Sequence, residues 1–107
     1  MFLGSVRRGD EDGAVTSIEY SAYEAMVREE ARHILDDATG RWPEARCVLK
    51  HRVGDVPAGE PSIVAAAAAP HRADAFEACR FVIDQAKARL PVWKKERFDD
   101  GATRWRS

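Results

Sequence analysis

Residues that build the commonest specialised sites are scarce in this 107-residue sequence. Its two cysteines, Cys47 and Cys79, are too few for a disulfide framework or a cysteine metal site. We therefore predict a reduced, cytoplasmic protein. The longest apolar run, residues 63–69, is far shorter than the roughly 20 residues of a membrane helix. Met1 is not followed by a signal-peptide pattern.

An excess of one charge is also lacking. The formal net charge is -1, so no overall basic field attracts nucleic acid or a membrane, and an anion site must be a local cluster. The sequence has no glycine-rich phosphate loop and no metal motif, so we expect neither a metal nor a cofactor. Its length and its 45% hydrophobic content predict one folded domain over residues 1–107.

The first half of the chain is expected to form two strands and a helix. Residues 2–7 and 14–20 alternate loosely and predict a hairpin, joined by the acidic loop at 8–13. Apolar residues then recur at helical spacing over residues 21–39. Ser21 fits the N-cap, and Gly40 and Pro43 follow the helix as stop signals.

The second half repeats this order and completes an α+β fold. Its predicted elements are a strand at 46–53, a turn at 54–61, a buried strand at 62–69 and a helix at 71–89. Pro91 ends the helix because it lacks an amide donor. The predicted order is β-β-α-β-β-α followed by a C-terminal tail.

Basic residues are the candidates for chemistry, although most Lys and Arg side chains are simply solvated. His71 and Arg72 begin a helix, where free amides and the helix dipole favour anions. Lys94 follows Trp93 and an apolar "LPV", a setting that suits an acid or base, with Trp93 expected in the pocket wall. Arg7 and Lys87 complete a candidate anion site.

The remaining histidines and cysteines carry less information. Cys79 lies on the apolar stripe of its helix and is expected to be structural. His51, followed by Arg52, ends a predicted strand, where a functional role and support of the next turn are equally open.

Several segments together resemble one family, the large, catalytic subunit of molybdopterin synthase. The resemblance covers Phe2 to Trp105 and is carried by these stretches: "FLGSVR", "YSAYEAM", "ARHILDDATGRWP", "HRVGDVPAGEPSIV", "APHRADAFEACRFVID" and "LPVWKKE". It implies an α/β-hammerhead type of fold. It also implies transfer of sulfur from the thiocarboxylated C-terminus of a small ubiquitin-like subunit to precursor Z (cyclic pyranopterin monophosphate), which forms the dithiolene of molybdopterin.

The resemblance also assigns an assembly and site residues. It implies a homodimer of large subunits within a heterotetramer, with no nucleic acid or membrane partner. Matched by motif, the catalytic residues are Lys87 and Lys94. The expected substrate-binding residues are Ser5, Val6, Arg7, His71, Arg72, Lys95 and Glu96.

Two departures from the family pattern motivate an alternative. Family members usually carry a few dozen residues before the strand at which this chain starts, and the loop at 8–13 is acidic where relatives often have Asn. The alternative is a truncated, non-catalytic anion-binding or scaffold protein on the same fold. The intact lysines and the His-Arg pair favour the enzyme.

The spacing of the candidate residues predicts a shared site. Lys87 lies 15 to 16 residues after Arg72 and His71 on one predicted helix, which is about 22–24 Å if the helix is straight. A pterin phosphate is only about 10 Å long on the scale of bonded atoms. We therefore expect a composite site across a two-fold dimer, with Lys87 and Lys94 from one chain and His71 and Arg72 from the other.

Overall fold

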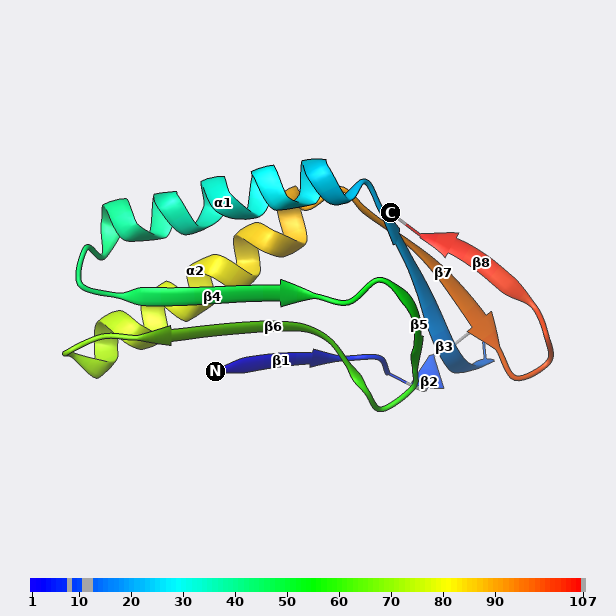
Figure 1. Cartoon of the computed structure of the whole chain (residues 1–107). Helices are drawn as coiled ribbons and strands as arrows, with labels where there is room; N and C mark the ends of the chain where they lie inside the picture. Colours follow the sequence, from blue (N-terminus) through cyan, green and yellow to red (C-terminus); the bar gives the residue numbers. More distant parts are fainter. Residues whose placement is uncertain (8, 11–12, 107) are drawn as a thin grey trace.

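The computed structural model describes residues 1–7, 9–10 and 13–106, and it has two sheets and two long helices (Figure 1). In chain order the elements are β1 (Phe2–Ser5), β2 (Gly9–Asp10), β3 (Gly13–Ala22), α1 (Glu24–Arg41), β4 (Arg46–His51), β5 (Gly54–Pro57), β6 (Pro61–Ala68), α2 (Arg72–Arg89), β7 (Val92–Phe98) and β8 (Thr103–Arg106). The fold is mixed α+β, as predicted.

The first sheet has the antiparallel order β1-β6-β4, and both helices pack against it. Alanines let α2 approach β6 closely, because Ala65 is fully buried and its carbonyl accepts a hydrogen bond from the Cys79 thiol at 3.4 Å. Ile34 and Ala38 of α1 and Val82 of α2 fill the space between the layers. The structural role predicted for Cys79 agrees with this position.

The second sheet is built around β3, which pairs with β7 on one side and with β5 and β2 on the other, while β8 pairs with β7. A smaller core of five buried residues lies on its inner face: Val6, Val15, Tyr20, Val56 and Phe98. In Figure 1 this sheet stands at one end of the molecule, beyond the last turn of α2.

Helix boundaries agree with the sequence better than strand pairing does. Helix α2 begins at Arg72, and Leu90 caps it directly before Pro91. Helix α1 begins later than predicted: Ser21 belongs to β3, and Tyr23 is the N-cap. Gly40 lies inside α1, whose C-cap is Trp42.

Three strand predictions were wrong. Strand β1 pairs with β6, so residues 2–7 and 14–20 form no hairpin with each other, and β3 instead forms a local hairpin with β2. Residues 54–57, predicted as a turn, form β5 along β3. The predicted tail forms β7 and β8. Three residues of the acidic loop, Arg8, Glu11 and Asp12, lie outside the described residues.

Within the described residues, neither α1 nor α2 contains a stretch long and apolar enough to cross a membrane.

Candidate functional site

Strand β7 places the predicted lysine Lys94 on the inner face of the second sheet. Glu96 and Phe98 are buried on that face, and side chains two residues apart in a strand share a face, so Lys94 lies with them. Lys94 is half-buried and stands directly opposite Tyr20 of β3. Opposite residues of an antiparallel pair project to the same side. The inner face therefore carries a partly buried amine beside a buried phenol.

A buried carboxylate organises the neighbouring cations. The side chain of Glu96 is 7% exposed, and its Oε1 lies 3.1 Å from Arg104 Nη2 and 2.8 Å from Arg106 Nε. Arg106 is in turn opposite Lys94 in the β7-β8 register. Two arginines thus pair with one buried carboxylate on the face that also carries Lys94, so this face gathers cationic side chains. The predicted substrate-binding role of Glu96 stays a prediction, and its visible contacts are these ion pairs.

His51 reaches the same region from the first sheet. Its ring meets the Tyr20 ring edge-on, with 4.9 Å between centroids and an interplanar angle of 72°. Its Nδ1 is 2.6 Å from the carbonyl oxygen of Arg52. Burial lowers the pKa of His51, the hydrogen bond to the Arg52 carbonyl raises it, and the charge of Lys94 lowers it again. A half-buried imidazole therefore stands within electrostatic range of Lys94.

The outer face of β7 carries the residues that flank Lys94. Trp93 projects away from Lys94, is 43% exposed and contacts the Tyr23 ring edge-on. The expectation that Trp93 walls a pocket for Lys94 is wrong, because strand alternation separates neighbours. Lys95 also lies on the outer face, with its Nζ 5.4 Å from the centroid of the Trp105 ring.

The segment from Ser5 to Arg7 joins the two sheets. Val6 is 3% exposed in the smaller core; its amide donates to the Glu60 carbonyl at 3.0 Å, and its own carbonyl accepts from Gly59 at 2.9 Å. Ser5 pairs with Pro61, and Arg7 is exposed. Val6 therefore anchors the segment, and the Arg7 side chain beside it is exposed to solvent.

The other predicted residues lie at the two ends of α2. Lys87 is exposed near the C-terminal end, with its Nζ 5.4 Å from the centroid of the Phe2 ring. His71 and Arg72 are exposed at the N-terminal end, where His71 is the N-cap. The helix is continuous, so about 22 Å of axis separates Arg72 from Lys87. In Figure 1 the N-terminal end of α2 points away from β7.

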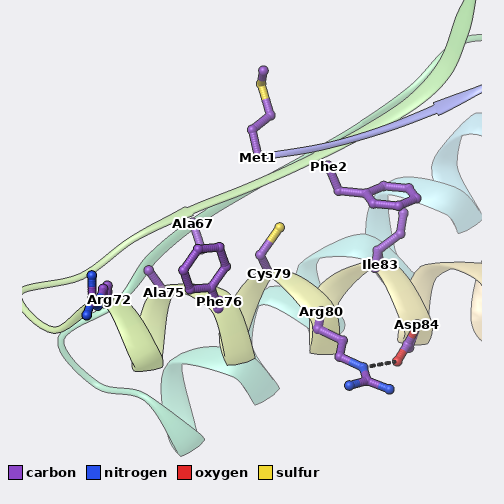
Figure 2. Close-up of a pocket in the computed structure, with 10 residues that line it drawn as sticks. All are labelled: Met1, Phe2, Ala67, Arg72, Ala75, Phe76, Cys79, Arg80, Ile83 and Asp84. Atoms are coloured by element: carbon purple, nitrogen blue, oxygen red, sulfur yellow. Dashed lines mark ion pairs between the residues drawn. The ribbon is translucent and has the colours of Figure 1, made fainter.

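A groove of about 570 Å³ runs along α2 beside the start of β1 (Figure 2). Phe2, Phe76 and Ile83 give it apolar walls, and an Arg80–Asp84 ion pair at 3.7 Å lies at its rim. Arg72 is its one predicted site residue. Neither catalytic candidate lines this groove, and Lys94 lies instead on the inner face of the second sheet.

The groups around Lys94 were not predicted from the sequence. Tyr20 falls in the predicted strand at 14–20, and Arg104 and Arg106 fall in the predicted C-terminal tail. The Asp-Gly turn at 99–102, between two short runs that contain aromatic residues, was the signal for the β7-β8 hairpin. Among the described residues, no three His, Cys, Asp or Glu side chains are grouped to hold a metal ion.

The family model and the relatives that match this chain all indicate the same protein family. The family model described as MoaE protein matches residues 1–89. A rice (Oryza sativa) protein named molybdopterin synthase catalytic subunit is 49% identical over 100 residues, which cover 94% of this chain and 52% of the rice protein. The bovine (Bos taurus) protein of the same name is 39% identical over 106 residues, which cover 99% of this chain and 56% of that protein.

A solved structure shares the whole fold. The chain superposes on molybdopterin synthase from Staphylococcus aureus with a TM-score of 0.94 at 30% identity, covering 99% of this chain and 77% of that one. The chain spans about half the length of the rice and bovine relatives.

Proposed function

Because this chain belongs to the MoaE protein family, we propose that it is the catalytic subunit of a molybdopterin synthase and acts as a sulfurtransferase. Sulfur would pass from the thiocarboxylated C-terminus of a small ubiquitin-like subunit to precursor Z, forming the dithiolene of molybdopterin. Relatives of up to 49% identity bear the name of this subunit. We place the reaction in the cytoplasm, since the two free thiols, Cys47 and Cys79, suit a reducing compartment.

The observation that carries the proposal is the cationic inner face around Lys94. The phosphate of precursor Z and the thiocarboxylate tail are both anions, and ionised hydrogen-bond donors bind such groups strongly. Lys94 is half-buried beside Tyr20, whereas Lys87 is exposed. We therefore assign proton transfer to Lys94 and anion binding to Lys87.

His71 and Arg72, at the N-terminal end of α2, can share a substrate site with Lys87 only if a second copy of the chain takes part. His71 and Arg72 are about 22 Å along the helix axis from Lys87, which is too far for one pterin to span. We propose that a two-fold dimer brings His71 and Arg72 of one copy to Lys87 and Lys94 of the other. Phe76, which is 71% exposed one turn after Arg72, would then be covered by the partner copy.

The small subunit would add its tail to this composite pocket, giving a heterotetramer around the central dimer. Ser5, Val6 and Arg7, with Lys95 and Glu96, complete the predicted contacts. Arg7 is the exposed cation of the first group, while Val6 and Glu96 hold the backbone and the arginines in place.

Reconstitution tests the proposed function. Purified protein is mixed with the thiocarboxylated small subunit and precursor Z, and molybdopterin is measured by chromatography. We expect product only with the thiocarboxylate, and none with a small subunit that ends in an ordinary carboxylate. Folded protein that yields no molybdopterin would instead support the anion-binding scaffold.

A further inference from the structure

His51 has a defined tautomer at the junction of the two sheets. It is the last residue of β4, and its Nδ1 lies 2.6 Å from the carbonyl oxygen of Arg52. A carbonyl oxygen can only accept a hydrogen bond, so Nδ1 carries the proton. In the neutral ring the lone pair is then on Nε2, which can accept a hydrogen bond.

Tyr20 fixes the direction of this ring, and Lys94 lies beside Tyr20. Tyr20 holds it edge-on at 4.9 Å between centroids, and Tyr20 is itself 6% exposed and immobilised in the smaller core. Lys94 stands opposite Tyr20 on β7, with the Cβ atoms of such pairs about 5 Å apart. The Lys94 side chain therefore begins next to Tyr20, whose ring the His51 imidazole contacts.

The surroundings of His51 favour the neutral imidazole over the charged one. Burial lowers the pKa of His51 most, the Arg52 carbonyl opposes this, and the positive charge of Lys94 lowers the pKa further. A lowered pKa favours the form of the ring that offers a lone pair to Lys94 over the form that carries a second positive charge.

We infer that His51 is a positioning residue for sulfur transfer, whose Nε2 accepts a hydrogen bond from the Lys94 ammonium and aims that group at the bound substrate. The role rests on the proposed function, because it acts through Lys94. His51 forms no bond to substrate in this role. Its effect is geometric, and a misplacement of about 1 Å in an active site can cost about 10²-fold in rate.

A purely structural role makes a different prediction. The Nδ1 hydrogen bond could serve only to shape the turn after β4, where Arg52 pairs with Glu60 at 3.0 Å. His51→Asn keeps a donor at the δ position and removes the ε acceptor. His51→Gln keeps an acceptor at the ε position and loses the δ donor.

Kinetics of these two variants separate the roles. We expect His51→Gln to keep kcat within about threefold of wild type, and His51→Asn to lose about 10–100-fold in kcat with little change in KM. Equal kcat values for the two variants, or a larger loss for His51→Gln, would overturn the inference. Thermal unfolding of both variants checks that the fold survives.

A measurement without turnover tests the proposed link between His51 and Lys94. In nitrogen-15 NMR, wild-type His51 should show the Nδ1-protonated tautomer, and Lys94→Met should raise its pKa because a nearby positive charge is removed. Lys95→Met is the matched control, since Lys95 faces the other side of the sheet, and it should leave the pKa of His51 unchanged. An unchanged pKa in Lys94→Met rejects the inference, even if the wild-type protein proves to be no synthase.

Discussion

At the scale of single residues, strand alternation gives two adjacent lysines different surroundings. Lys94 faces the inner side with Tyr20, while Lys95 faces the outer side under Trp105. The sequence motif identified Lys94 as the residue to test, but it placed Trp93 beside it. The face on which each of these side chains lies could not be predicted, because strand β7 itself was not predicted.

Removing the Lys94 amine tests its assignment. We expect Lys94→Ala to lower kcat by about 10²–10⁴-fold, as is usual for a lost acid or base. Lys50→Ala is the control, because Lys50 is an exposed lysine on β4 outside the site. Turnover of folded Lys94→Ala within twofold of wild type would remove the residue from the mechanism.

The cysteines should be dispensable for sulfur transfer. Burial and the neighbouring Cys79 raise the pKa of Cys47, which disfavours the reactive thiolate. Cys47→Ser and Cys79→Ser should both keep synthase activity. Cys79→Ser should cost about 1–3 kcal/mol in unfolding free energy, because it places a hydroxyl in the core. Denaturant unfolding measures this cost, and a persulfide trapped on either cysteine during turnover would show a different route for sulfur.

At the scale of elements, local patterns predicted the helices and missed part of the second sheet. The end of α2 follows from Pro91, a local constraint. Strands β5 and β7 depend instead on pairing with β3 across many residues of chain. Short runs with glycine, proline and charge, such as residues 54–57, carry little periodicity of their own, so only the tertiary pairing reveals them.

Two glycine-to-alanine substitutions should change the stability of the protein in opposite directions. A Cβ on Gly4 would lie 2.6 Å from Cγ2 of buried Ile63, so Gly4→Ala should destabilise the protein by about 1–3 kcal/mol. Gly40 lies within α1, and a Cβ added there would meet no atom within 4 Å, so Gly40→Ala should stabilise by about 0.5–1 kcal/mol. Urea unfolding of both variants is the measurement, and a stable Gly4→Ala would show that β1 does not pair with β6 in the register described.

At the scale of the whole molecule, the structure keeps the two groups of predicted residues apart along α2, as their spacing in the sequence implied. The residues at the two ends of α2 are separated because the helix is unbroken over 18 residues. The junction of His51, Tyr20 and Lys94 could not be foreseen, since it joins three strands whose pairing is non-local. The prediction that two copies share each pocket follows from the first point.

Complementation between two inactive variants tests this shared sulfur-transfer site most directly. Arg72→Ala and Lys94→Ala chains are mixed, subunit exchange is verified by the mass of tagged dimers, and molybdopterin synthesis is measured. In a mixed dimer one pocket draws Arg72 and Lys94 from the two unmutated positions, so we expect up to about half of wild-type activity per mixed dimer. No recovery of activity despite demonstrated exchange would contradict the account.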